Sequence, residues 1–175
     1  MRAELVQSPS RRAFLKRFSQ PAEVSLPESH YPRPPWARDN AVFLSLCTRC
    51  EQCIDACPQK VLRKSDELDP VLQGLPIQTL DYGSCDSCGR CEKACDTGAL
   101  SFKEGIRVQA VALINDHCES GYGQPCSLCI ESCAAGALSV QLKKKAQVDT
   151  ELCTGCGECA LDCHSRAISL VRKHQ

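Results

Sequence analysis

The sequence has few aromatic residues and no long hydrophobic run. Phe, Trp and Tyr make up 5% of its 175 residues, and tryptophan occurs once. Few side chains are thus available for a large packed core, and a unit of about 60 residues is only marginally stable by burial alone. The longest apolar run, residues 110–114, is far too short to cross a membrane. These absences predict small units that need another source of stability, and no transmembrane segment.

An excess of charge of one sign is also absent. The chain carries 21 Lys and Arg residues against 21 Asp and Glu residues, so its formal net charge is zero. This balance argues against nucleic acid as the main partner. The sequence also lacks a glycine-rich nucleotide loop, a nucleophile triad and a paired acid–base constellation. We therefore expect no enzymatic activity of the chain's own.

Cysteine, by contrast, is abundant and regularly spaced. The 16 cysteines form four quartets of the type C-x2-C-x2-C-x3-C, the third in an expanded version, and none is left over. This spacing is typical of bacterial [4Fe–4S] ligation, in which three cysteines bind one cluster and the fourth binds its neighbour. We predict four [4Fe–4S] clusters with the metal-binding ligands Cys47, Cys50, Cys53, Cys57, Cys85, Cys88, Cys91, Cys95, Cys118, Cys126, Cys129, Cys133, Cys153, Cys156, Cys159 and Cys163.

Disulfide bonds and zinc are the alternative uses of so many cysteines. Small secreted proteins with disulfide frameworks reach a similar cysteine density. Triplets spaced x2, x2 would crowd such bridges together, however, and structural zinc usually takes two separated C-x2-C pairs. The C-x3-C-x2-C pattern of radical-forming clusters appears nowhere. Free thiolates fit a reducing compartment, so we expect a cytoplasmic protein whose clusters hold its fold together.

The segments around the quartets predict one order of elements that occurs twice: strand, quartet, hairpin, quartet, strand. The predicted strands cover residues 41–46, 61–62, 76–80, 99–102, 108–114, 137–142, 147–149 and 167–171. In each copy the opening and closing strands can pair. The predicted fold class is therefore α+β, with two tandem bacterial-type 2[4Fe–4S] ferredoxin units. We place an N-terminal extension at 1–41, the first unit at 42–104 and the second at 105–175.

The tandem arrangement predicts crossed ligation within each unit. In the first unit, one cluster would bind Cys47, Cys50, Cys53 and Cys95, and the other Cys85, Cys88, Cys91 and Cys57. In the second unit, one would bind Cys118, Cys126, Cys129 and Cys163, and the other Cys153, Cys156, Cys159 and Cys133. The alternative is a nested pairing of quartets one with four and two with three, as in the four-cluster subunits of molybdenum oxidoreductases. Sequential strands usually pair, which favours the tandem arrangement.

The third quartet is irregular because seven residues separate Cys118 from Cys126. The insertion can bulge and keep all four ligands, or Cys118 can be lost to leave a [3Fe–4S] centre. We favour the bulge, since Gly121 and Gly123 permit tight turns. In the first quartet, the charge of Arg49 is expected to raise the reduction potential of its cluster.

The cysteine-free start of the chain contains a basic motif and a proline-rich linker. Residues 10–16 (SRRAFLK) match the twin-arginine export consensus, but the residues that follow are charged and interrupted by Pro21. We predict no export, and instead a short amphipathic helix that docks on the chain's own body or on a partner. Weak binding to a membrane surface is the alternative. Trp36, at the end of the linker, is expected to pack against the first cluster unit.

These features together resemble the NapF family, the ferredoxin-type accessory proteins of the periplasmic nitrate reductase system. The resemblance is carried by SRR at residues 10–12, RPPW at 33–36, CTRC at 47–50 and the expanded third quartet. It implies a cytoplasmic iron–sulfur protein that contacts the catalytic subunit of the periplasmic nitrate reductase before export. It also implies that the protein assists maturation of that subunit, by supplying electrons or by helping with its iron–sulfur centre. A redox donor protein is a further candidate partner.

Two other functions remain open from the sequence. An electron-transfer subunit of another oxidoreductase complex would form a stable, stoichiometric complex. A scaffold with structural clusters would keep its function after the reduction potentials were changed.

Overall fold

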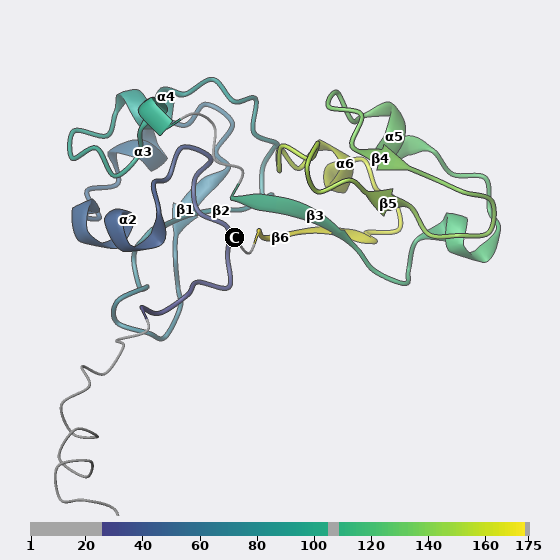
Figure 1. Ribbon diagram of the computed structural model, residues 1–175, viewed down its shortest axis with the longest axis horizontal. Helices are drawn as coiled ribbons and strands as arrows, with labels where there is room; N and C mark the ends of the chain where they lie inside the picture. Colours follow the sequence, from purple (N-terminus) through teal and green to yellow (C-terminus); the bar gives the residue numbers. More distant parts are fainter. Residues whose placement is uncertain (1–25, 105–108, 174–175) are drawn as a thin grey trace, which may run out of the picture.

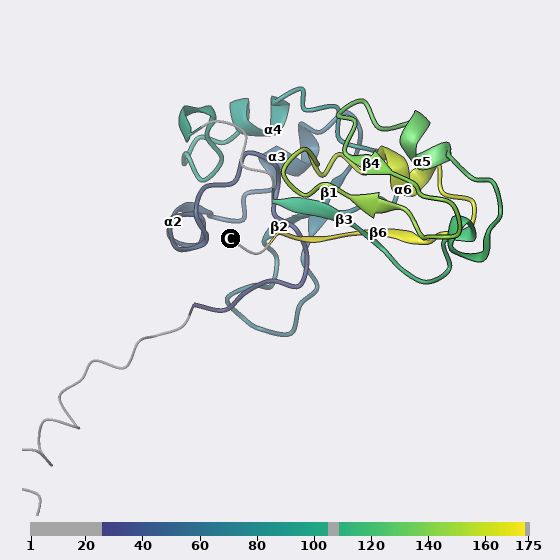
Figure 2. The same cartoon turned by 45° about the vertical axis from the view of Figure 1, so that its right-hand side comes forward.

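Two lobes lie side by side in the computed structural model, which describes residues 26–104 and 109–173 (Figure 1, Figure 2). The first lobe contains α2 (Asn40–Leu46), α3 (Gln52–Asp55), β1 (Leu62–Lys64), β2 (Pro76–Gln78), α4 (Arg90–Lys93) and the 3-10 helix η1 (Phe102–Glu104). The second lobe contains β3 (Ala110–Ile114), the 3-10 helix η2 (Glu119–Tyr122), α5 (Leu128–Glu131), β4 (Leu138–Ser139), β5 (Gln147–Val148), α6 (Glu158–Leu161) and β6 (Ile168–Arg172). The helix expected around the twin arginines lies outside the described residues. Within the described ranges, no helix is long and apolar enough to span a membrane.

A short antiparallel hairpin follows the first quartet, and another follows the third. In the first lobe β1 pairs with β2, so that Leu62 lies opposite Gln78. In the second lobe β4 pairs with β5, so that Leu138 lies opposite Val148. Each hairpin leads the chain from one quartet to the next. The two hairpins expected between quartets are therefore confirmed, with strands shorter than expected except for β1.

The longest ladder closes the second lobe. Strands β3 and β6 pair antiparallel, from Ala110 opposite Arg172 to Ile114 opposite Ile168. Along β3 the side chains of Ala110, Ala112 and Ile114 are buried, while those between them are more exposed. This alternation is typical of a strand with one face on the core. The expected pairing of opening and closing strands is confirmed for this lobe.

The first lobe differs from the prediction at both of its ends. Residues 41–46, expected as a strand, form helix α2, in which the Phe43 N–H donates to Asp39 O at 2.8 Å and the Cys47 N–H donates to Phe43 O at 2.9 Å. A short apolar run suits either element, and here the helix buries one ring, that of Phe43. Residues 99–102 form no strand either, because Leu100 makes only an isolated bridge with Ala37. The end of the proline-rich linker thus takes the place that the opening strand was expected to fill.

Each lobe has a small core of its own. Trp36, Phe43 and Leu75 belong to the first core, whereas the second consists mainly of Ala, Ile, Leu and Cys side chains. Trp36 is 7% exposed and packs edge-to-face on Phe102, with ring centroids 4.4 Å apart. The expected packing of the lone tryptophan in this part of the chain is confirmed. Cysteines contribute to both cores, so the candidate ligands are also packing residues.

Two buried glutamine side chains connect the lobes. Gln78 Nε2 donates to Gly155 O at 2.8 Å, and Gln109 Nε2 donates to Ala37 O at 3.2 Å. Both glutamines are buried, with 2% and 7% of their surface exposed. A buried amide is costly without a partner, so these bonds favour one relative position of the lobes.

Candidate iron–sulfur sites

Each quartet consists of a loop followed by one helical turn. The helices α3, α4, α5 and α6 carry the third cysteine of their quartets, which are Cys53, Cys91, Cys129 and Cys159. Three of these helices begin directly after a residue in the left-handed region: Glu51, Gly89 and Gly157, with φ of 68°, 69° and 93°. In the expanded third quartet the corresponding residue is Ser127, with φ of −134°. The third loop therefore approaches its helix along a different path.

The fourth cysteine of three quartets accepts a backbone hydrogen bond on its sulfur. An N–H group donates to Sγ of Cys95, Cys133 and Cys163, at 3.4, 3.3 and 3.3 Å. Before two of these bonds the chain turns back at a glycine with positive φ, Gly98 at 70° and Gly136 at 62°. Hydrogen bonds of this kind to ligand or cluster sulfur tune the reduction potential of an iron–sulfur cluster.

Four pockets bring the cysteines together in groups of four, each group drawn from two quartets of one lobe. The first pocket is lined by Cys47, Cys50, Cys53 and Cys95, and the second by Cys57, Cys85, Cys88 and Cys91. The third is lined by Cys118, Cys126, Cys129 and Cys163, and the fourth by Cys133, Cys153, Cys156 and Cys159. The crossed scheme assigns the same four groups to four clusters. That each group binds a cluster remains a prediction.

Burial dominates the acid–base chemistry of the third cysteine in every quartet. Burial, with the neighbouring thiols adding to it, raises the pKa of Cys53, Cys91 and Cys159 to about 12. The pKa of Cys129 is raised for the same reasons. Without a metal these thiols are neutral near pH 7, so a metal has to displace their protons when it binds.

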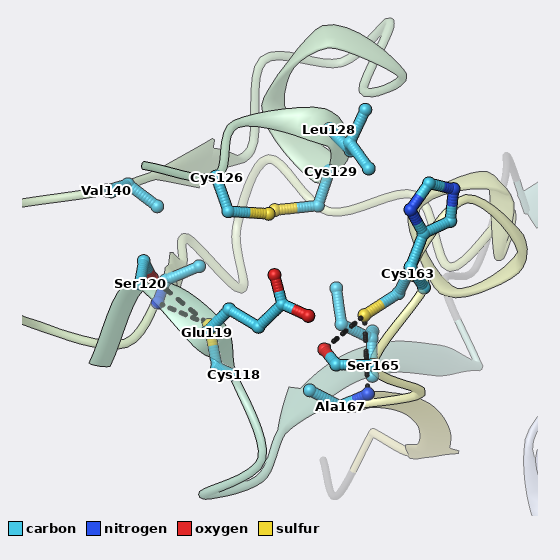
Figure 3. Close-up of a pocket in the computed structure, with 13 residues that line it drawn as sticks. Cys118, Glu119, Ser120, Cys126, Leu128, Cys129, Val140, Cys163, Ser165 and Ala167 are labelled. Atoms are coloured by element: carbon cyan, nitrogen blue, oxygen red, sulfur yellow. Dashed lines mark hydrogen bonds between the residues drawn. The ribbon is translucent and has the colours of Figure 1, made fainter. Parts of the chain in front are cut away.

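The third pocket surrounds the expanded quartet and is shown in Figure 3. Cys126 and Cys129 lie on one side of it, with Cys118 and Cys163 on the other. The side chain of Glu119 extends between them, so this pocket has a carboxylate in its lining. The expected bulge is thus formed by η2, and Cys118 stays at the pocket with the other three cysteines.

Hydrogen bonds hold Cys118 in place. Its Sγ lies 3.1 Å from Ser120 Oγ, and the Ala146 N–H donates to the same sulfur at 3.5 Å. Ser120 Oγ also donates to Lys144 O at 3.0 Å, which connects the insertion to the turn between β4 and β5. Burial acts to raise the pKa of Cys118, but hydrogen bonds with Ser120 and from the Ala146 N–H lower it below its ordinary value. Cys118 is therefore deprotonated more easily than Cys129, the cysteine of the same pocket whose pKa is raised.

The second and fourth pockets meet where the lobes touch. The Cys85 N–H, from the loop of the second pocket, donates to Cys156 O, from the loop of the fourth, at 2.8 Å. Beside this bond, Ser84 Oγ donates to a carboxylate oxygen of Glu158. The first and second pockets share one lobe, and the third and fourth share the other. The four pockets therefore form a series in the order first, second, fourth, third.

The donor sets fit iron–sulfur clusters better than the alternatives. All 16 cysteines lie within the described residues, and all are free thiols, so no disulfide framework is present among them. Within the described ranges, no three His, Cys, Asp or Glu side chains are placed to hold a single metal ion. Four thiols around a mainly apolar space, with N–H groups aimed at sulfur, are the donors that a [4Fe–4S] cluster takes.

Arg49 lies in the lining of the first pocket, and its side chain is anchored to a nearby loop. Its Nε donates to Gln73 O at 3.0 Å, and its Nη2 donates to Val71 O at 2.7 Å. The residue is exposed, so solvent and salt screen its charge. The effect of Arg49 on the reduction potential remains a prediction.

Comparisons with known families support this chemistry. Residues 46–99 match a family described as a 4Fe-4S dicluster domain, and residues 145–168 match one described as a 4Fe-4S binding domain. The chain carries two ferredoxin-type 4Fe-4S domains. The first match spans the first two quartets and the second match spans the fourth. The prediction of ferredoxin-type iron–sulfur chemistry is thereby confirmed.

Curated relatives match over short stretches. Ferredoxin-type protein NapF of Escherichia coli (strain K12) is 50% identical over 32 residues, which are 18% of this chain and 20% of that protein. Ferredoxin-type protein NapG of Haemophilus influenzae is 35% identical over an 85-residue alignment, which covers 39% of this chain and 30% of that protein. The chain thus spans a minor part of the length of the relatives it matches.

One solved structure shares a weak likeness with this chain. It is a chain of the formate dehydrogenase - heterodisulfide reductase - formylmethanofuran dehydrogenase complex from Methanospirillum hungatei. The match has a TM-score of 0.26 and 23% identity, and it covers 69% of this chain and 46% of that chain. A likeness at this level carries no argument about fold or function.

Proposed function

We propose that this chain is an electron carrier with four [4Fe–4S] clusters. The observation that carries the proposal is the series of four pockets, each lined by four free cysteines. A cluster bound in a pocket would accept or release one electron. The protein's part is to hold each cluster by its thiols, to shield it with apolar side chains and to donate N–H groups to sulfur. The bond from Cys85 to Cys156 gives electrons a short route between the lobes.

We further propose that the client is the catalytic subunit of the periplasmic nitrate reductase. On this proposal the protein acts in the cytoplasm, assists maturation of that subunit before its export, and receives electrons from a redox donor protein. Support comes from the short matches to NapF and NapG. Further support comes from the motifs SRR at residues 10–12 and RPPW at 33–36.

The cluster proposal is tested by iron and sulfide analysis of protein purified without oxygen. Cys153→Ala removes a thiol of the fourth pocket and should lower the iron and sulfide content by one cluster out of four. Thr154→Ala changes the exposed neighbouring residue and serves as the matched control, with full content expected. Full content in Cys153→Ala would contradict the ligand scheme. Native protein that holds zinc and no sulfide would end the cluster proposal altogether.

The client proposal is tested by affinity capture from nitrate-respiring cells. The full chain and a chain lacking residues 1–20, both loaded with clusters to the same extent, serve as baits. We expect the full chain alone to capture the nitrate reductase catalytic subunit, because the N-terminal extension is proposed to recognise the client. Equal capture by both baits would remove that recognition role. A stable, stoichiometric complex with the mature enzyme would instead favour an electron-transfer subunit.

A further inference from the structure

Arg33 is a buried cation with no hydrogen-bond partner among the described residues. Its side chain is 2% exposed, and within residues 26–104 and 109–173 none of its guanidinium nitrogens Nε, Nη1 and Nη2 has a hydrogen-bond partner. The guanidinium carbon lies 5.1 Å from the centroid of the Phe43 ring. Burial, helped by the like charge of Arg172, lowers the pKa of Arg33 to about 10, so the group stays charged at neutral pH. A buried charge is costly unless an opposite charge compensates it, and a ring face compensates only a small part.

Within the described residues, no carboxylate forms a direct hydrogen bond with the Arg33 guanidinium. Arg172 and Arg49 lie close enough to add positive charge. The negative charge of Glu67 favours the charged form of Arg33. Its carboxylate, however, accepts a hydrogen bond from Ser29 Oγ at 2.7 Å and none from Arg33. Glu67 therefore attracts Arg33 without a direct contact, while Arg172 and Arg49 repel it.

The first pocket offers the missing negative charge. Phe43, whose ring Arg33 covers, is part of the wall of this pocket together with Cys47. The charges of Arg33 and an ionised Cys47 attract each other. A [4Fe–4S] cluster with four thiolate ligands is an anion, and reduction adds one more negative charge to it. A buried cation beside the cluster therefore stabilises the reduced form more than the oxidised form.

Among the described residues, no Lys or Arg lines any of the other three pockets. Asp86 lines the second pocket and Glu119 the third, while the lining of the fourth includes no Asp, Glu, Lys or Arg. The acidic residue in the lining of the first pocket, Glu51, is paired with Lys64 at 3.0 Å. The balance of charge thus favours an added electron in the first pocket over the other three.

We infer that Arg33 gives the cluster of the first pocket the highest reduction potential of the four. The inference rests on the proposed function, since it requires clusters in the pockets. With clusters bound, one electron would pass from a reduced cluster elsewhere in the series, which would become oxidised, to the cluster held by the first pocket, which would become reduced. No proton moves and no covalent bond forms or breaks. The first pocket ends the series and its Cys50 is exposed, so it is the exit for electrons toward an acceptor protein.

The test is a redox titration of anaerobic holoprotein, followed by electron paramagnetic resonance. Arg33→Met removes the charge and keeps an unbranched side chain. At the ambient potential where the first-reduced cluster of the native protein is half reduced, this variant should show a reduced-to-oxidised ratio about tenfold lower. Arg49→Met removes an exposed charge and should lower the ratio less. Ile77→Val changes packing at another buried position without altering charge, and should leave the ratio unchanged.

Two results would overturn the inference. One is an unchanged ratio in Arg33→Met, and the other is an equal drop in Ile77→Val, which would assign the effect to packing. A second variant does not depend on whether Arg33→Met folds. Cys50→Ser keeps Arg33 but changes one ligand of the first pocket, so it identifies which signal comes from that pocket. The first-reduced signal should then change its potential or line shape, and an unaltered signal would place the highest potential elsewhere. Native protein without iron and sulfide would refute the proposed function instead, which is a separate outcome.

Discussion

At the scale of single residues, two loop glycines meet different requirements. Gly89 and Gly98 have nearly the same backbone conformation, with φ of 69° and 70°. A side chain at Gly89 would overlap the ring of Phe102, whereas nothing lies within 4 Å of the position it would take at Gly98. In another quartet the residue equivalent to Gly98 is Lys60, with φ of 51°, so a side chain is tolerated at that turn.

This difference predicts unequal costs for two matched substitutions. Gly98→Ala should lower the free energy of unfolding by about 1–2 kcal/mol, the cost of a left-handed backbone with a Cβ. Gly89→Ala should cost about 1–3 kcal/mol more, because the new methyl group displaces Phe102 and with it Trp36. Denaturant unfolding of the loaded protein measures both. Equal costs would mean that the Phe102 ring moves aside freely.

Some residues could not have been assigned their roles from the sequence. Arg49, Glu51 and Ser87 adopt positive φ, at 60°, 68° and 56°, although glycine is the usual residue there. The conformation recurs at the equivalent positions of the first, second and fourth quartets, whereas Ser127 in the third has φ of −134°. Arg33 drew attention only as part of the RPPW motif, because an arginine is normally exposed and its burial depends on contacts distant in the chain.

At the scale of elements, the hairpins between quartets and the strand in the apolar run 108–114 were predicted correctly, whereas the strands expected at 41–46 and 99–102 did not form. The two hairpins between quartets formed as expected, since the segments between quartets are bounded by cysteines and turns at fixed positions. Residues 41–46 form helix α2. Six apolar or small residues are compatible with the periodicity of a helix and of a strand, and no partner strand is present beside them in the described part of the chain. Which element forms there depends on Ala37 taking the place beside Leu100.

The candidate sites were more predictable than the strands around them. Cysteine spacing alone identified all 16 thiols as candidate cluster ligands, and in the structure every one of them lines one of the four pockets. Sequence spacing within a loop limits where three thiols can lie, so little depends on distant packing. The path of the insertion in the third quartet is different, because it depends on Ser120 reaching the carbonyl of Lys144. No pattern in the sequence predicts that contact.

At the scale of the whole molecule, the relative position of the lobes depends on polar contacts rather than on a shared apolar core. Gln78 and Gln109 each donate a buried hydrogen bond from their side chain to a backbone carbonyl of the other lobe. Neither has a sequence signal, since glutamine is usually exposed. The two lobes have separate hydrophobic cores. Loss of these amides should therefore loosen the junction without unfolding either lobe.

The double variant Gln78→Leu with Gln109→Leu tests this arrangement. It leaves two buried carbonyls without partners, and each should cost about 1–3 kcal/mol. We expect calorimetry of the loaded protein to show two separate transitions in place of a single one. Gln59→Leu, an exposed glutamine that bonds to Asp86 within the first lobe, is the control, with a change within about 0.5 kcal/mol. A single transition in the double variant would show that other contacts set the junction.

The position of Trp36 has a practical consequence. It is the sole indole of the chain, and it forms part of the wall of the second pocket. Iron–sulfur chromophores absorb broadly across the ultraviolet and visible range, so a cluster seated beside this fluorophore would quench its emission. The brightness of one natural reporter would then follow the filling and emptying of one pocket among four, without any attached dye.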